Sequence, residues 1–279
     1  MAPLTSEVGA LVWTDYYDVP GLQRVLSQNP QLTWVQLPFA GVDAFEGVID
    51  ASLRFTSAKG CYREPVAEHA LMLCMALGRK IPERVRAQRW GEKFAVSLYD
   101  ADVVIVGAGG ITEELIKLLT PMRSRVTVVR NRASEPVAGA ERTVSLDLLP
   151  EVLKSAQFVI LACALTEQTR GLFDWAMLRN LPASAYLVNI ARGPVVVTDA
   201  LLDALASGRL AGAAVDVTDP EPLPVGHQAW LEPNLIITPH SADTPEMVAG
   251  MFAARLRENA AAYLGRGPWV GEVDPQLGY

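Results

Sequence analysis

Short apolar segments rich in β-branched residues alternate along this chain with segments whose apolar residues recur at helical spacing. That alternation is typical of parallel sheets covered by helices. No internal repeat or low-complexity segment interrupts it. The strands that the pattern predicts span residues 9–13, 32–38, 53–58, 101–107, 125–130, 158–164, 185–191, 212–217 and 234–239.

Two longer helical patterns predict connectors between domains. The first starts after Pro65 and becomes basic in GRKIPERVRAQRW, where Pro82 should bend or end the helix. The second runs from Thr244 to Gly265 and carries a single apolar stripe. The two connectors separate a middle part of the chain from two ends that belong together.

This division predicts an α/β fold of two doubly wound parallel-sheet, Rossmann-like domains. A nucleotide-type domain should span residues 96–261. Residues 1–95 and 262–279 should together form the other domain.

Composition and charge exclude several classes of protein. The chain of 279 residues is 50% hydrophobic, so it can bury two modest cores without metal ions or cross-links. Its net charge of −7 argues against a nucleic-acid surface, and an anionic substrate would need local positive charge. Cys61, Cys74 and Cys163 show no CxxC spacing, which favours reduced thiols. Without a basic leader or a long apolar run, we expect a cytoplasmic protein that binds no membrane.

The segment VVIVGAGGIT predicts a phosphate-binding turn. A buried strand leads into Gly107, Gly109 and Gly110, and the helical pattern EELIKLLTPM follows. Glycines let backbone amides approach a pyrophosphate at the helix N-terminus. Thr112 stands at the third glycine position, where a small residue favours close packing of helix on strand. A glycine-rich turn without a ligand is the alternative.

The next predicted strand ends in Arg130, Asn131 and Arg132, where an NAD-selective site would place a carboxylate on the ribose. No acidic residue appears there before Glu135. Guanidinium groups match the oxygens of a 2′-phosphate, which favours NADP (NADPH) over NAD. The alternative is that these arginines are merely solvated at a strand end.

Three polar residues of catalytic type follow successive predicted strands. They are Arg192 in LVNIARG, Glu221 in the proline-rich loop after AAVDV, and His240 in LIITPHSAD. An arginine can bind a carboxylate and polarise the adjacent carbonyl, while a histidine donates a proton as hydride arrives. A glutamate beside the histidine would favour its protonated form. Taken singly, each residue has an ordinary structural explanation, and their common placement carries the hypothesis.

The motifs VNIARG, VDVTDPEPLP and ITPHSAD, in this order after GAGGIT, resemble the signature blocks of the D-isomer-specific 2-hydroxyacid dehydrogenases. LTWVQLPFAGVD resembles the substrate loop of that family, EPVAEHALML the start of its interdomain helix, and EVDPQLGY its closing strand. LACALTEQTRGLFD resembles the segment under the cofactor. The resemblance implies hydride transfer between NADP(H) and a small 2-keto or 2-hydroxy acid, with a glyoxylate or hydroxypyruvate reductase as the first expectation.

The resemblance implies that residues 96–261 form a dinucleotide-binding domain, that residues 1–95 and 262–279 form a flavodoxin-like substrate domain, and that the active site lies in the cleft between them. It also implies roles for individual residues. Arg192 would bind the substrate carboxylate and carbonyl, His240 would be the acid or base with Glu221 as its partner, and Asp216 would hold the nicotinamide carboxamide. No metal is implied. Backbone amides at Ala40 and Gly41 would bind the substrate carboxylate. The residues expected to contact the cofactor are Gly107, Gly109, Gly110, Ile111, Thr112, Arg130, Asn131, Arg132, Cys163, Ala164, Thr169, Ile190, Ala191 and Asp216.

Three departures from the family pattern affect these expectations. Ala164 replaces the usual proline of the segment under the cofactor, and Thr112 replaces a small residue. Family members also have a strand and a helix before the strand that GALVW resembles. The substrate domain is therefore expected to be small, with one edge covered differently or by a partner, unless the sequence is truncated.

Two other functions fit the same motifs. One is a non-catalytic dinucleotide sensor, because the family includes a transcriptional corepressor of the same fold. The other is a dehydrogenase of a neutral aldehyde or ketone, in which Arg192 would matter little. The basic helix from Lys80 to Arg89 resembles the arm through which family members dimerise, so we expect a homodimer through the nucleotide-binding domains. A solvated basic connector is the alternative.

Overall fold

The computed structural model describes residues 5, 7–16 and 18–275. It divides into a central unit, residues 63–243, and a terminal unit made of residues 1–62 and 244–279. The sequence pattern places the corresponding boundaries near residues 95 and 262. Helix α2 (Arg63–Gly78) packs on strands of the central unit, and helix α8 (Pro245–Tyr263) bonds to those of the terminal unit. Neither is divided between the two.

The central unit is built on a sheet of seven parallel strands in the order β10-β9-β8-β7-β4-β5-β6. Strand order reverses between β4 and β7, which is where open α/β sheets bind their ligands. The strands are β4 (Asp102–Val106), β5 (Arg125–Val129), β6 (Arg142–Val144), β7 (Phe158–Leu161), β8 (Tyr186–Asn189), β9 (Gly212–Val215) and β10 (Leu235–Ile237).

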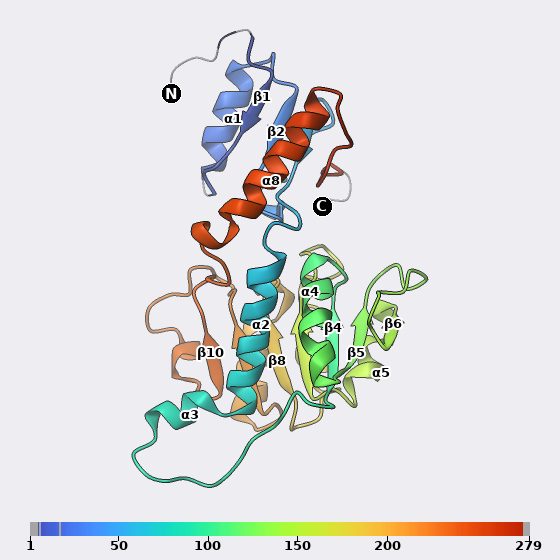
Figure 1. Ribbon diagram of the computed structural model, residues 1–279. Helices are drawn as coiled ribbons and strands as arrows, with labels where there is room; N and C mark the ends of the chain where they lie inside the picture. The colour runs from blue at the N-terminus through green and yellow to red at the C-terminus, as the bar shows by residue number, and fades with distance from the viewer. Residues whose placement is uncertain (1–4, 6, 17, 276–279) are drawn as a thin grey trace. The chain divides into compact units, whose positions relative to one another are not determined.

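Helices cover both faces of this sheet, which explains why its central strands are mostly apolar. On one face α2 and α4 (Gly110–Leu119) lie side by side (Figure 1). The other face packs in one apolar core against three helices, which are α5 (Leu149–Leu153), α6 (Trp175–Leu178) and α7 (Thr198–Ala206). Short 3₁₀ turns are η2 (Thr120–Met122), η3 (Leu146–Leu148), η4 (Gly193–Val195) and η5 (Gln228–Leu231).

Helix α2 ends earlier than the sequence pattern indicated. A Cβ on Gly78 would lie 2.7 Å from the carbonyl oxygen of Val96, and the amide of Val96 donates to the carbonyl of Gly78. The chain then turns at Lys80, which has a left-handed φ of 50°. Pro82 therefore does not end α2. It lies in the first turn of a new helix, α3 (Ile81–Arg86), where a missing N–H costs nothing.

The terminal unit holds a sheet of three parallel strands, β1 (Ala10–Val12), β2 (Trp34–Gln36) and β3 (Arg54–Thr56). Val35, Leu37 and Phe55 face an apolar core shared with α1 (Val19–Gln28) and the 3₁₀ turn η1 (Asp43–Phe45). Because side chains alternate along a strand, Gln36 and Thr56 face the opposite side, where Asn259 of α8 bonds to Gln36 and Thr56 bonds to the same Gln36 oxygen.

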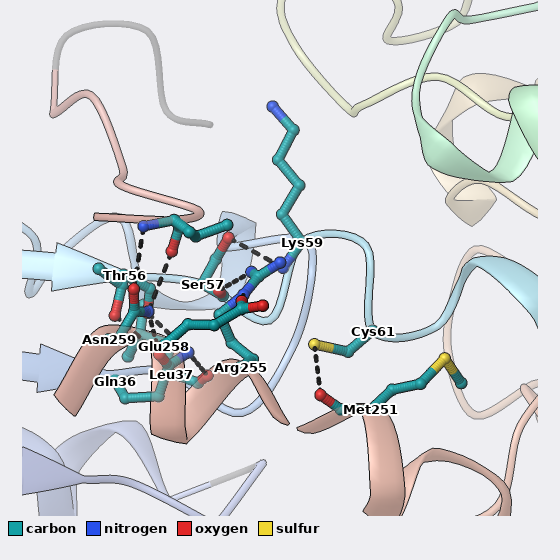
Figure 2. Close-up of polar contacts among 11 residues, drawn as sticks. Gln36, Leu37, Thr56, Ser57, Lys59, Cys61, Met251, Arg255, Glu258 and Asn259 are labelled. Atoms are coloured by element: carbon teal, nitrogen blue, oxygen red, sulfur yellow. Dashed lines mark hydrogen bonds and ion pairs between the residues drawn. The ribbon is translucent and has the colours of Figure 1, made fainter. Parts of the chain in front are cut away.

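Helix α8 is attached to the three-stranded sheet through buried polar groups (Figure 2). The side-chain amide of Asn259 donates to Gln36 Oε1 at 2.9 Å and to the carbonyl of Val270 at 3.0 Å. Its oxygen accepts the amide of Val270 at 2.9 Å, and Thr56 donates to the same Gln36 oxygen. One turn earlier, Arg255 donates to the carbonyl of Ser57. This network ties the last helix and the segment after it to the sheet.

Every strand predicted from the apolar segments is present, and the α/β prediction with two Rossmann-like parallel sheets is confirmed. Strand β6 was not predicted. The expected closing strand is only an antiparallel bridge from Thr56 to Glu272 among the described residues, and residues 276–279 lie outside them. Within the described part of the chain, no helix combines the length and apolarity needed to cross a membrane.

Replacing Asn259 by Ala should lower the free energy of unfolding by about 2–4 kcal/mol, because the amide and carbonyl of Val270 and one bond of Gln36 lose their buried partner. Urea unfolding followed by circular dichroism measures the loss. The exposed neighbour Arg257→Ala is the control and should stay within about 0.5 kcal/mol of the unsubstituted protein. Equal stability of the two variants would contradict the role of Asn259.

Candidate active site and cofactor site

The glycine turn lies at the reversal of strand order. Gly107 has a φ of 114°, and a Cβ there would meet the carbonyl oxygen of Ala162 at 2.3 Å. Only glycine fits this position. Gly109 precedes α4, and a Cβ on it would meet nothing within 4 Å. The amides of Gly110 and Ile111 begin the helix, where N–H groups lack intrahelical partners. The open cradle suits a pyrophosphate.

Thr112 is compatible with close packing of α4. Its side chain is fully buried, and its hydroxyl donates to the carbonyl of Gly107 at 3.0 Å. The hydroxyl thus finds a partner in the turn itself. The larger residue at the third glycine position therefore holds the turn to the helix.

Arg130, Asn131 and Arg132 follow β5, next to the glycine turn. The amide of Gly107 donates to Val129, the last residue of β5, at 2.8 Å. Arg130 is bound by Glu135, whose carboxylate lies 3.0 Å from Nη2 and whose carbonyl accepts from Nη1 at 3.2 Å. The same carboxylate lies 3.7 Å from Arg132 Nε. The two arginines therefore share one acidic partner of their own chain.

The segment after β7 forms a compact turn on the other side of the glycine motif. Thr169 donates to the carbonyl of Ala164 at 2.7 Å, and its hydroxyl accepts the amide of Thr166 at 2.8 Å. Asn131 reaches this turn by donating to Gln168 at 3.1 Å. At Ala164, where the family has a proline, the bonds of Thr169 thus hold the backbone in this turn.

Cys163, Ile190 and Ala191 follow strands of the same sheet. Ile190 and Ala191 are buried directly after β8. Cys163 is half-buried, and its burial raises the thiol pKa to about 11. At that pKa the group is a neutral thiol at physiological pH, so it has no nucleophilic character.

Arg192 follows β8 and lies beside the loop that carries Glu221. A Cβ on Gly193 would lie 1.9 Å from the carbonyl oxygen of Thr218, so only glycine allows the two backbone segments to approach. The carbonyl of Arg192 accepts from Asn189 at 3.0 Å, which fixes the turn after the strand. Thr218 in turn bonds to Glu221 Oε2 through its amide, at 3.3 Å.

Glu221 and His240 form an ion pair. His240 Nδ1 lies 2.6 Å from Glu221 Oε1, and about two fifths of each side chain is exposed. The hydrogen bond to Glu221 raises the pKa of His240 above its ordinary value, against the opposing effects of burial and of Arg192. The same bond lowers the pKa of Glu221. The pair thus favours imidazolium beside carboxylate, and Arg192 acts electrostatically on both.

Asp216 is buried and holds the turn that presents His240. Oδ1 accepts from the Thr238 hydroxyl at 2.5 Å and from the amide of Ser241 at 2.9 Å, and Oδ2 accepts the amide of Ala242 at 3.2 Å. Its carbonyl accepts the amide of His240, which has a left-handed φ of 50°. Burial alone would raise the pKa of Asp216, but these bonds and His69 outweigh it and lower the pKa. The role implied for Asp216, a contact to the nicotinamide carboxamide, stays a prediction.

Two residues of this region, His69 and Asp243, were not identified from the sequence. His69 Nε2 lies 3.1 Å from Thr238 Oγ1 and 3.3 Å from Asp216 Oδ1. Asp243, next to the His240 turn, has its pKa raised by burial. His69 lies in EPVAEHALML, next to the apolar position Ala70. The helical pattern there gave no sign of a hydrogen-bonding partner for its side chain. Among the described residues, no group of acidic, histidine or cysteine side chains is placed to hold a metal ion.

Ala40 and Gly41 belong to the terminal unit and lie in the loop between β2 and η1. Their contact to the substrate carboxylate stays a prediction. The nearby Leu37 and Tyr62 are buried, and Tyr62 donates its hydroxyl to the carbonyl of Pro38 at 2.6 Å. These two side chains therefore form part of the core of the terminal unit.

Replacing Gly193 by Ala should destabilise the central unit by about 1–3 kcal/mol, because the added methyl overlaps the Thr218 carbonyl and must force two backbone segments apart. Denaturant unfolding tests this. Gly91→Ala is the matched control, since the nearest atom to its Cβ is the end of the Arg84 side chain at 3.9 Å. If the two variants unfold alike, the close approach of these loops is not a constraint.

A family model for the D-isomer specific 2-hydroxyacid dehydrogenase, NAD binding domain, matches residues 70–242. An uncharacterized protein in the proB 3′ region of Corynebacterium melassecola is 36% identical over 256 residues, which cover 89% of this chain and 84% of that protein. Its function is not stated.

Solved structures agree with this match. A D-isomer specific 2-hydroxyacid dehydrogenase from Xanthobacter autotrophicus Py2, in complex with NADPH and MES, gives a TM-score of 0.83 at 30% identity and covers 98% of this chain and 86% of its own. An NADPH-dependent glyoxylate/hydroxypyruvate reductase from Sinorhizobium meliloti, in complex with NADP and sulfate, gives 0.83 at 25% identity, with 98% and 87% covered. The chain belongs to the D-isomer-specific 2-hydroxyacid dehydrogenases, oxidoreductases that use a nicotinamide dinucleotide.

Proposed function

We propose that this protein reduces a small 2-keto acid of the glyoxylate or hydroxypyruvate type with NADPH. The observation that carries the proposal is the His240–Glu221 pair beside the Arg192 turn, at the carboxyl ends of β8, β9 and β10. This arrangement offers a proton donor and a guanidinium at the edge of the sheet where the phosphate turn also lies. The names of related proteins support the substrate class.

Each residue has a separate task in the proposed reaction. Arg192 binds the carboxylate of the keto acid and polarises the adjacent carbonyl. Glu221 holds Nδ1 of His240, so we assign the transferred proton to Nε2, which gives it to the carbonyl oxygen in reduction. A bound nicotinamide supplies the hydride in this direction and accepts it in the reverse one. In oxidation, the neutral ring of His240 takes the hydroxyl proton.

The preference for NADPH rests on Arg130 and Arg132. Both follow β5 next to the glycine turn, and planar guanidinium groups match the oxygens of a 2′-phosphate. The cradle at Gly107 and Gly109 would hold the pyrophosphate. Solved relatives bound to NADPH or NADP support this preference.

We also propose that the protein is a homodimer that associates through the segment around α3. The side chains of Val85 and Trp90 are 75% and 97% exposed, which is high for apolar residues. Association of two copies would cover them. The basic residues of the same segment would then lie at the rim of the interface.

A panel of glyoxylate, hydroxypyruvate, pyruvate and phenylpyruvate, each with NADPH and with NADH, should show NADPH oxidation with one of the first two. Arg192→Gln should lower kcat/KM about 100-fold or more, because the carboxylate loses its charged partner in the transition state. Arg142→Gln, an exposed arginine of β6, is the control and should leave the rate unchanged. An intact rate in Arg192→Gln would favour a neutral aldehyde or ketone. Cofactor binding without turnover of any keto acid would favour a sensor.

The pH dependence of the reaction should depend on Glu221. Reduction needs protonated His240, so its rate should fall as the pH rises through the raised pKa. Glu221→Gln removes the main cause of the raised pKa, so the alkaline limit of kcat/KM should move to lower pH. In oxidation, the acid limit should move in the same direction. Profiles of the exposed Glu141→Gln control should match those of the unsubstituted protein. A Glu221→Gln profile that stays in place would rule out this coupling.

A further inference from the structure

The carboxylate of Glu135 pairs with both arginines that are proposed to bind the 2′-phosphate of NADPH. Arg130 Nη2 bonds to this carboxylate at 3.0 Å, and Arg132 Nε lies 3.7 Å from it. A turn closed by the bond from the amide of Glu135 to the carbonyl of Arg132, at 3.1 Å, brings the acid back onto the end of β5. The chain thus supplies its own anion at this place.

The three residues differ in how strongly they are held. Only 16% of the Arg130 side chain is exposed, against 54% for Glu135 and 73% for Arg132. Arg130 is also held by the backbone, because its Nη1 donates to the carbonyl of Glu135 at 3.2 Å. The guanidinium would therefore stay in position if the carboxylate moved away. The exposed carboxylate is the group with room to leave.

A phosphate monoester is a better partner for both arginines than this carboxylate. It carries up to two negative charges and three acceptor oxygens, whereas the carboxylate carries one charge and two oxygens. At 3.7 Å, the contact of Arg132 Nε with Glu135 exceeds hydrogen-bond length. The second arginine thus keeps donor capacity that a third oxygen can satisfy.

We propose that Glu135 is a specificity-determining residue that competes with the 2′-phosphate of NADPH for Arg130 and so moderates the preference for NADPH over NADH. This inference rests on the proposed NADPH site. When the phosphate binds, the carboxylate leaves Arg130 and turns into solvent. When the ribose carries no phosphate, Glu135 stays in place and neutralises the arginines, so the same pocket accepts NADH without an unbalanced charge.

Calorimetric titration of the full chain with 2′,5′-ADP and with 5′-AMP, at low and at physiological salt, tests the competition. Glu135→Gln keeps the size of the side chain but removes its charge. It should bind 2′,5′-ADP about two- to fivefold more tightly, the range expected for release of an exposed ion pair, and should leave 5′-AMP nearly unchanged. The gain should shrink at higher salt.

Two further variants separate the possible causes. Glu141→Gln removes the same charge from an exposed acid beside the first residue of β6, so it should reproduce any effect of net charge alone. Arg130→Gln should abolish the preference for 2′,5′-ADP over 5′-AMP. If Arg130→Gln keeps the preference of the unsubstituted protein, the NADPH site itself is wrongly assigned.

Other results would contradict the role of Glu135 without contradicting the NADPH site. If Arg130→Gln loses the preference but Glu135→Gln binds 2′,5′-ADP no more tightly than the unsubstituted protein, the NADPH site stands and the competition does not. Weaker binding by Glu135→Gln would show that the carboxylate orients Arg130 for the phosphate. Equal gains in Glu135→Gln and Glu141→Gln would reduce the effect to net charge, which also overturns the proposal.

Discussion

The buried carboxylate of Asp216 is the constraint on which the geometry of the candidate active site depends. An ionised group that is 2% exposed is stable only if it is fully hydrogen-bonded. Its donors come from Thr238, Ser241 and Ala242, which surround His240 in the sequence. Satisfying the charge therefore forces the chain after β10 into one turn, and the left-handed backbone of His240 is a consequence of it. The imidazole is positioned by a residue that need not touch the substrate.

Close approach of the backbone brings the other two side chains to the same edge of the sheet. Gly193 removes the Cβ that would separate the Arg192 turn from Thr218, and Thr218 bonds to Glu221. Glu221 then reaches His240 at 2.6 Å. The raised pKa of His240 thus depends on a glycine that follows β8, two strands from β10 in the sheet, because a displaced loop would lengthen the bond that raises this pKa.

Much of the fold follows from the sequence because strands covered on both faces must be apolar throughout. Strand β6 was missed since only Val144 of its three residues is buried. The end of α2 depends on a contact between Gly78 and Val96, which no periodicity reveals. In the site, strand ends predicted the polar residues that cluster after β8, β9 and β10. The strand ends did not predict that His69 contacts Asp216, because His69 lies on α2 and the strand pattern does not show where that helix packs on the sheet.

Because the chain as a whole is negatively charged, binding of an anion depends on arginines at the binding site itself. The net charge is −7, yet the proposed ligands, a dinucleotide and a keto acid, are anions. At the end of β5, Arg130 already pairs with an anion of the same chain, the carboxylate of Glu135. Under this proposal, binding an anion there would exchange one counter-ion for another, so Arg130 would have a negative partner with and without the ligand. Selectivity would then depend on which anion carries more charge and more acceptor oxygens for the two arginines, and a phosphate exceeds a carboxylate in both.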